Sequence, residues 1–180
     1  KNEGIQESNL IEINTGEKII EGPCEKMSKS KKNVVEPAEI LENFGINATR
    51  IFMISDSPPD RELEWTDNGI QSSKNLINRI DRYFEKEKNN DANHSIKEVT
   101  KFVTSMENNI LNFSLNKCVA NIYTLFNFLE KKSIYLNNHD LSKKILVCLY
   151  PIVPSLSAKI FKNFFNSEIT KESWPIVNEK

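Results

Sequence analysis

Long apolar runs are missing from this 180-residue sequence, as are the groupings of cysteine and histidine that build metal sites. No stretch approaches the roughly 18–20 consecutive apolar residues that a membrane-spanning helix needs, so we expect no membrane partner. The three cysteines, Cys24, Cys118 and Cys148, lie far apart and form no C-x-x-C pair. This spacing argues against a zinc site and a disulfide framework, so the sequence predicts no bound metal and favours the reducing cytoplasm.

An initiator methionine and a signal peptide are also missing. The first four residues, Lys1 to Gly4, lack the positively charged and then apolar layout of a secretion signal. We therefore interpret the sequence as part of a longer protein. Hydrophobic residues make up 38% of it, which is enough for a core and argues against global disorder.

The net charge of −1 conceals an uneven distribution of charged residues. Residues 1–25 carry two lysines against six glutamates, whereas residues 67–166 carry fourteen lysines and arginines against nine acidic residues. A mildly basic C-terminal half suits contact with nucleic acid, although charges scattered along helices are usually only solvated. Arg79 and Arg82 lie close together on one predicted helix, and we take them as candidate contacts to an RNA backbone.

Four lysines stand within the seven residues from Lys26 to Lys32, a segment that we name the lysine loop. Only serines and Met27 separate them. Ammonium groups on flexible stems, together with open backbone N–H groups ahead of a helix, suit a polyanionic phosphate. Such a run by itself is more often a solvated loop or a basic targeting patch, so the flanking residues decide its interpretation.

A short β-hairpin is predicted before the lysine loop, and short helices after it. Residues 10–13 and 18–21 alternate weakly around an intervening turn. A helix is expected from Pro37 to Gly45, because proline suits the first helical position and glycine the end. A second helix is expected with Asn47 as its N-cap. The predicted buried faces consist of Ile40, Leu41 and Phe44 in the first helix and Ile51, Phe52 and Ile54 in the second.

Apolar residues then recur at helical spacing in five longer segments. The first segment begins at Thr66 or Asp67, the second is predicted to be capped by Ser95, and the third starts at Ser114. Short loops between such helices argue for an antiparallel helix bundle, so the chain is predicted to be mostly α. The predicted core is Ile70, Leu76, Ile77, Ile80, Tyr83 and Phe84, then Ile96, Val99, Val103, Met106 and Ile110, then Leu115, Val119, Ile122, Phe126 and Leu129, then Leu141, Ile145, Cys148 and Leu149, and finally Leu156, Ile160, Phe161 and Phe164.

The five residues Lys26-Met27-Ser28-Lys29-Ser30 match the KMSKS motif of class I aminoacyl-tRNA synthetases letter for letter. Their flank adds to the resemblance. Residues 26–53 resemble the family layout of loop, asparagine, two apolar residues, an acidic residue with proline, a helix, a glycine and a further helix with arginine.

Three further segments are similar to leucyl-tRNA synthetases of bacterial type in particular. Residues 55–69, with their two prolines and the run Leu-Glu-Trp-Thr-Asp, favour leucine over the valine, isoleucine and methionine members. Residues 113–117 and 149–156 resemble the helical bundle of the same family. The resemblance covers about residues 5–178 and is strongest at 26–69.

The resemblance implies a division of the chain into four parts. Residues 1–25 would end an inserted β-rich segment, and residues 26–66 would hold the KMSKS loop and its connector to the catalytic domain. Residues 67–168 would form a bundle like the anticodon-binding domain of these synthetases, and residues 169–180 would lead to a further domain. The family's other nucleotide-binding motif is absent, so we expect this part to have no activity alone and to bind no cofactor alone.

The implied reaction joins leucine and ATP, with Mg²⁺, into leucyl-adenylate and pyrophosphate, and then transfers leucine to tRNA(Leu) in the cytoplasm. The resemblance makes Lys29 the main catalytic lysine, with Lys26 supporting it. Met27, Ser28 and Ser30 complete the ATP-binding loop. Lys31 and Lys32 would contact tRNA, as would the candidate arginines of the bundle, and the enzyme would act as a monomer.

Two other interpretations stay open at this point. The chain could belong to another aliphatic-specific class I synthetase, for isoleucine, valine or methionine, because the parts that select the amino acid lie elsewhere. It could instead be a non-catalytic helical RNA-binding module whose lysine loop binds phosphate without performing chemistry.

Overall fold

The computed structural model describes residues 11–18, 25–55, 58, 61–86, 92–136 and 139–176. The chain divides into two compact units, residues 1–36 and residues 37–180. The first unit carries the lysine loop, and the second carries the helices.

The described part of the first unit begins with a tight turn. Ile11 and Lys18 form an antiparallel bridge, and the Glu12 amide donates a hydrogen bond to the Glu17 carbonyl over 2.9 Å. This is the turn of the predicted hairpin, but no strand forms within the described residues, so the hairpin is not confirmed beyond this one bridge. Residue 10 and residues 19–21, which would complete its strands, lie outside the described residues.

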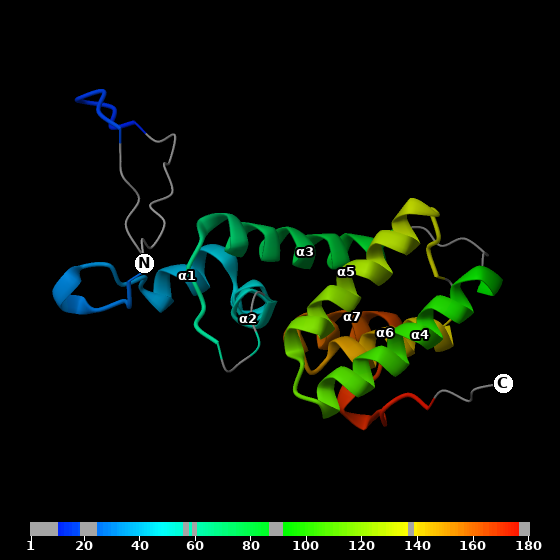
Figure 1. The fold of residues 1–180 in the computed structure, drawn as a ribbon. Coiled ribbons are helices and arrows are strands. Elements are labelled where there is room, and N and C mark those ends of the chain that lie inside the picture. The colour runs from blue at the N-terminus through cyan, green and yellow to red at the C-terminus, as the bar shows by residue number, and fades with distance from the viewer. Residues whose placement is uncertain are drawn as a thin grey trace, which may run out of the picture. The chain divides into compact units, whose positions relative to one another are not determined.

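The second unit is helical, which confirms the predicted mostly α class (Figure 1). Its described residues form seven α-helices and a short 3₁₀-helix. These are α1 (Pro37–Phe44), α2 (Ile46–Ser55), α3 (Asp67–Glu85), α4 (Ala92–Leu111), α5 (Leu115–Lys131), α6 (His139–Leu149), α7 (Pro154–Phe165) and η2 (Ile169–Lys171). Within this part of the chain, no helix is both long enough and apolar enough to cross a bilayer.

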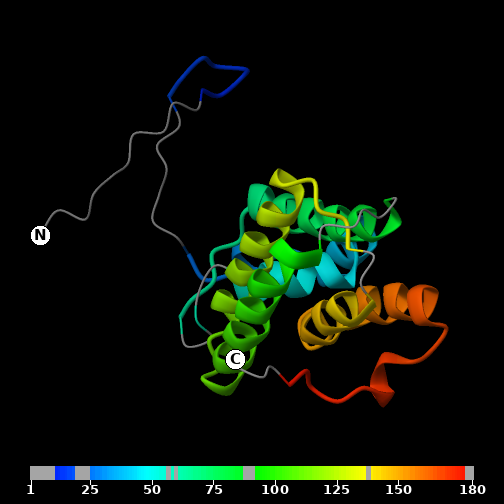
Figure 2. The same cartoon turned by 90° about the vertical axis from the view of Figure 1, so that its right-hand side faces the viewer.

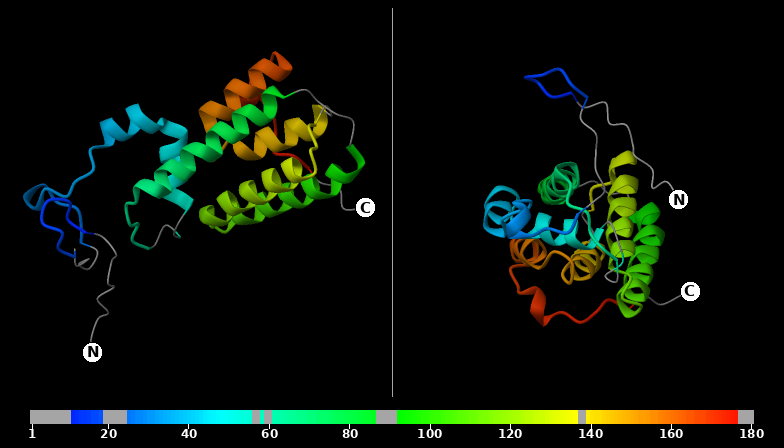
Figure 3. Two further views of the ribbon diagram at one scale, coloured as in Figure 1. Left: turned by 90° about the horizontal axis from the view of Figure 1, so that it is seen from above. Right: turned by 60° about the vertical axis from the view of Figure 1, so that its left-hand side comes forward.

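Neighbouring helices pack as pairs. Helices α4 and α5 run side by side, joined by a tight turn (Figures 1 and 3), and α6 and α7 form a second pair (Figure 2). Helix α2 packs against α3 and α5, and α4 also contacts α6. Short connections between contacting helices give the antiparallel bundle that the sequence predicts.

The bundle core contains almost all the apolar positions predicted from helical spacing. Leu76, Ile80, Val103, Ile122 and Phe161 are all buried within one continuous cluster. Each such side chain contributes about 1.5–3 kcal/mol when it leaves water completely. A smaller cluster of Ala48, Phe52 and Ile70 joins α2 to α3, and Trp65 packs edge-on against Phe52 with 4.8 Å between ring centroids.

Both ends of α1 follow the predicted residue preferences, and α3 (Asp67–Glu85) begins at one of the two predicted residues. Helix α1 begins at Pro37, and Gly45 closes it with φ of +80° while its amide donates to the Leu41 carbonyl over 3.0 Å. Thr66 is the N-cap of α3, because its Oγ1 accepts a hydrogen bond from the Gly69 amide over 3.2 Å. A threonine oxygen satisfies an amide that the helix leaves without a partner.

Two predicted caps are wrong. Helix α2 begins at Ile46, and the Asn47 Oδ1 accepts from the Ser155 hydroxyl over 2.9 Å instead of capping. Helix α4 begins at Ala92, so Ser95 lies inside it and is completely buried. Both residue types favour caps in isolation, but their environment in the bundle places them elsewhere.

Two predicted core positions are exposed. Leu41 is 42% exposed and Ile96 is 46% exposed. In α1, Ile40 and Phe44 make the contact with the smaller cluster, which leaves Leu41 on the outer side. In α4, the buried stripe starts with Ser95. It continues through Val99, Phe102 and Val103 at helical spacing, which leaves Ile96 outside it.

Candidate functional site

The lysine loop folds into a single 3₁₀ turn, η1 (Lys29–Lys31). Ser28 precedes it with extended backbone, and its Oγ accepts a hydrogen bond from the Lys31 amide over 3.3 Å. The turn ends at Lys32, which has φ of 53° and donates from its amide to the Lys29 carbonyl over 3.2 Å. A serine with extended backbone is a favourable cap, so the KMSKS letters themselves supply the start of this turn.

Asn33, which directly follows the lysine loop, forms hydrogen bonds with the backbone at the start of the loop. Its Oδ1 accepts a hydrogen bond from the Ser28 amide over 2.8 Å, and its Nδ2 donates to the Lys26 carbonyl over 3.4 Å. Sequence reasoning did not assign Asn33 to the site. The residue type could have indicated this role, because asparagine side chains readily form hydrogen bonds with nearby backbone groups.

The four lysines of the loop are not equivalent. All four are exposed, but Lys31 pairs with Glu25, with 2.9 Å between Nζ and Oε2. That pair is worth about 0–1 kcal/mol, because both side chains are more than half exposed. Within the described residues, the ammonium groups of Lys26 and Lys29 have no ion-pair partner, so they are available to an anion.

Two serine hydroxyls complete this surface. Ser28 Oγ and Ser30 Oγ lie 3.2 Å apart, and Ser30 is exposed. Met27 is 42% exposed, although it is the one large apolar side chain of the loop. Cationic amines with neighbouring hydroxyl donors can bind phosphate oxygens and can follow charge that develops on them. The loop therefore has the chemistry of a phosphate site.

The two candidate arginines of the bundle differ in their surroundings. Arg79 donates from Nε to Glu130 Oε2 over 2.7 Å, and the two side chains are only 21% and 32% exposed. Arg82 donates from Nε to the Asn78 carbonyl of its own helix over 3.2 Å and stays exposed. Arg82 is therefore the more accessible of the two cations.

Arg50 has a structural position in the second unit. Its guanidinium donates from Nε to the Ile152 carbonyl and from Nη2 to the Pro151 carbonyl, each over 3.0 Å. These two hydrogen bonds connect α2 with the turn between α6 and α7. A planar guanidinium suits such a double contact.

The described cysteines are not candidate nucleophiles. Cys118 and Cys148 are buried and form no disulfide. Burial raises the pKa of both thiols above the ordinary value, and for Cys148 the nearby Glu107 raises the pKa further. A thiol with a raised pKa stays protonated at neutral pH and is a poor nucleophile.

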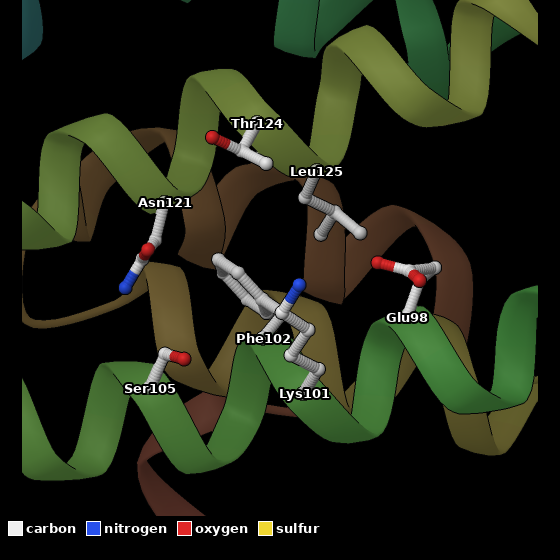
Figure 4. A pocket seen from close by; sticks show the side chains of 7 residues that line it. All are labelled: Glu98, Lys101, Phe102, Ser105, Asn121, Thr124 and Leu125. Carbon is white, nitrogen blue, oxygen red and sulfur yellow. The ribbon is translucent and has the colours of Figure 1, made fainter.

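A small cavity of about 40 Å³ lies between α4 and α5, and side chains of both helices line it (Figure 4). The Asn121 Nδ2 atom is buried and has no hydrogen-bond partner among the described residues. A cavity of this size holds about one to three water molecules, which would satisfy that amide. The cavity is therefore not a candidate substrate site. Its lining residues are Glu98, Lys101, Phe102, Ser105, Asn121, Thr124 and Leu125.

Comparison with known proteins places these features in a family. Residues 13–66, which include the lysine loop, match the family model described as tRNA synthetases class I (I, L, M and V). The leucine–tRNA ligase of Zymomonas mobilis is 35% identical over 94% of this chain, and that of Rickettsia typhi is 31% identical over 86%. The chain spans about a fifth of the length of these curated relatives, 21% and 20% respectively.

A solved structure shares the fold. It is a ternary complex of Agrobacterium radiobacter K84 agnB2 LeuRS with tRNA and LeuAMS. The match has a TM-score of 0.73 at 21% identity, and it covers 85% of this chain and 23% of that one.

The matched sequence is thus similar to a segment of class I aminoacyl-tRNA synthetases, and the fold is shared with one such segment. Within that class, the chain is similar to leucine–tRNA ligases over most of its own length. The predicted resemblance is confirmed at both levels, whereas the roles of individual residues stay predictions.

Proposed function

We propose that this chain supplies the ATP-phosphate loop and a tRNA-docking bundle to a leucine–tRNA ligase. The observation that carries the proposal is the KMSKS sequence folded into a turn that leaves the Lys26 and Lys29 ammonium groups without ion-pair partners in the described part of the chain. The whole enzyme would activate leucine with ATP, supplied as its magnesium complex, and would transfer leucine to tRNA(Leu) as a cytoplasmic monomer. We assign residues 26–66 to the loop and connector, and 67–168 to the bundle.

In the first step, a carboxylate oxygen of leucine attacks the α-phosphorus of ATP. The bond from that phosphorus to the bridging oxygen breaks, so negative charge develops on the departing pyrophosphate. The Lys29 ammonium would stabilise this charge, with Lys26 in support and the Ser28 and Ser30 hydroxyls as further donors. A preorganised donor aimed at developing charge lowers the barrier more than it strengthens substrate binding.

The tRNA would be bound mainly through its phosphates. Lys32 is exposed in the loop, and Lys31 pairs with an exposed glutamate, which a phosphate could replace. On the bundle, Arg82 and Arg79 are the proposed contacts. Binding by phosphate neutralisation releases counterions, so the affinity should fall steeply as the salt concentration rises.

The test is leucine-dependent ATP–pyrophosphate exchange by the full-length enzyme that contains this chain. We expect Lys29→Ala to slow exchange by about 10²–10³-fold, the usual effect of losing one preorganised donor. Lys26→Ala should slow it less. Lys162→Ala, which removes an exposed lysine of α7, is the matched control and should exchange normally.

Two outcomes would contradict the proposal. A normal exchange rate in Lys29→Ala would remove this lysine from the mechanism. Faster exchange with isoleucine, valine or methionine than with leucine would assign the enzyme to another member of the class. If the full-length protein bound tRNA and catalysed no exchange with any of these amino acids, it would be an RNA-binding protein without synthetase activity.

A further inference from the structure

Within the described part of the chain, few apolar contacts hold the lysine loop in one conformation. Its residues are largely exposed, and Met27, its one large apolar side chain, is 42% exposed. Four like charges within seven residues repel one another, and the one ion pair that the loop makes with described residues, from Lys31 to Glu25, is itself exposed. The conformation of the lysine loop therefore depends mainly on hydrogen bonds.

The hydrogen bonds of Asn33 close this loop. The Oδ1 contact at 2.8 Å fixes the Ser28 amide, and the longer Nδ2 contact at 3.4 Å reaches the Lys26 carbonyl. Ser28 in turn caps η1 through its Oγ and accepts from the Lys31 amide with its carbonyl over 3.1 Å. One side chain thus fixes the residue on which the turn depends.

We propose that Asn33 is the positioning residue of the lysine loop. It presets the backbone on both sides of Met27, so that Lys29 leaves the turn in the direction needed to meet the pyrophosphate group. The inference rests on the proposed function, because only an enzyme that uses Lys29 on phosphate needs this direction. Asn33 itself does not have to touch the substrate.

The two Asn33 contacts can be separated by substitution. Asn33→Ala removes both hydrogen bonds. Asn33→Asp keeps an oxygen acceptor for the Ser28 amide and loses only the longer contact to the Lys26 carbonyl. Asn33 is exposed, so neither change removes a buried group from the helical core.

The first measurement is the temperature coefficient of the Ser28 amide proton by ¹⁵N-resolved NMR of this chain. The wild-type amide should show the small coefficient of a hydrogen-bonded proton, as should Asn33→Asp. Asn33→Ala should show the larger coefficient of a solvated amide. An unchanged coefficient in Asn33→Ala would overturn the inference, because the hydrogen bond from the Ser28 amide to Asn33 would not exist in solution.

The second measurement is ATP–pyrophosphate exchange by the full-length enzyme. Asn33→Ala should lower kcat about tenfold, the rate equivalent of losing the shorter of its two hydrogen bonds, and should leave the KM for leucine and the melting temperature unchanged. Asn33→Asp should recover most of kcat. If Asn33→Ala acted only by destabilising the fold, the melting temperature would fall and Asn33→Asp would not recover kcat.

The outcomes distinguish the inference from the proposed function. Normal kcat in Asn33→Ala, or an Asn33→Asp enzyme as slow as Asn33→Ala, overturns the positioning role while a slow Lys29→Ala enzyme leaves the proposed function intact. A normal rate in Lys29→Ala overturns the proposed function, and the positioning role falls with it.

Discussion

Arg79 donates its Nε–H to Glu130 Oε2 over 2.7 Å and so joins α3 to α5 across 51 residues of sequence. The same guanidinium cannot turn fully toward a phosphate without losing this partner. Arg82, three residues further along α3, donates to a carbonyl of its own helix and has no ion-pair partner among the described residues. Two arginines that look alike in the sequence are therefore expected to behave differently.

We expect Arg82→Ala to weaken tRNA binding by the full-length enzyme and to reduce the slope of log affinity against log salt by about one. Arg79→Ala should affect tRNA binding less and should lower the free energy of unfolding by up to about 1 kcal/mol, because the lost ion pair is partly exposed. Binding titrations at several salt concentrations, with urea unfolding, measure both effects. Equal losses of affinity in the two variants would contradict this distinction.

Gly69 should not tolerate a side chain. A Cβ atom at this position would lie 2.6 Å from Thr66 Oγ1 and 2.7 Å from Phe52 Cε2. Gly69→Ala should therefore destabilise the bundle by about 1–3 kcal/mol through overpacking. Urea unfolding followed by circular dichroism measures this, with Gln71→Ala on the exposed face of α3 as the control. A stabilised Gly69→Ala variant, as for an uncrowded helical glycine, would contradict the close approach of α2 to α3.

Removing Arg50 should loosen the turn between α6 and α7. Arg50→Ala leaves the Pro151 and Ile152 carbonyls without these donors, and we expect a loss of about 1–2 kcal/mol in the free energy of unfolding. Arg50→Lys should recover less than half of it, because an ammonium lacks the planar pair of donors. Arg61→Ala removes an exposed arginine and serves as the control. Equal stability of the alanine and lysine variants would rule out the double contact.

Stability should decline in alkaline solution. Burial raises the pKa of Cys118 and Cys148 above 9.0, and it raises the pKa of Tyr83 above 10.0. In the unfolded chain these groups release their protons at the ordinary values, so above about pH 9 the unfolded state binds fewer protons than the folded state. The free energy of unfolding therefore falls as the pH rises.

Urea unfolding at pH 7.5, 9 and 10.5 measures this decline. The full contribution should be present at pH 7.5, below the unfolded values, and should diminish toward pH 10.5. Combining Cys118→Ala with Cys148→Ala should flatten the part of the decline that begins near pH 9, while the part that comes from Tyr83 should stay. A profile that is flat in the wild type would contradict the raised pKa values.

Helical spacing in the sequence was sufficient to predict the five long helices and nearly all of their core, because each buries one continuous stripe. The start of α3 was predicted at Thr66 or Asp67, and it follows a local cap, because the Thr66 hydroxyl acts on an amide three residues away. Asn47 was not predicted correctly, because its partner Ser155 is 108 residues distant. Sequence patterns predict contacts between residues that are close in the chain. They predict contacts between helices only where those contacts are apolar.

In the candidate site too, some residues were predicted from the sequence and others were not. The lysines and serines of the loop were found from their letters alone, since the motif is contiguous. The Glu25 partner of Lys31 and the Glu130 partner of Arg79 were not found, because opposite charges at these separations have no periodicity. Asn33 lies next to the motif and was overlooked because it carries no charge.

Several helices of this protein end without glycine. Lys32, Phe113, Ser133 and Asn166 follow η1, α4, α5 and α7 with φ between 48° and 53°, whereas Gly45 takes the corresponding position after α1. A left-handed backbone costs a side-chain-bearing residue about 1–2 kcal/mol. The chain thus carries removable strain at its helix ends. At Lys32 that strain coincides with a cation of the lysine loop, so a glycine there would relax the backbone and discard a positive charge in the same step.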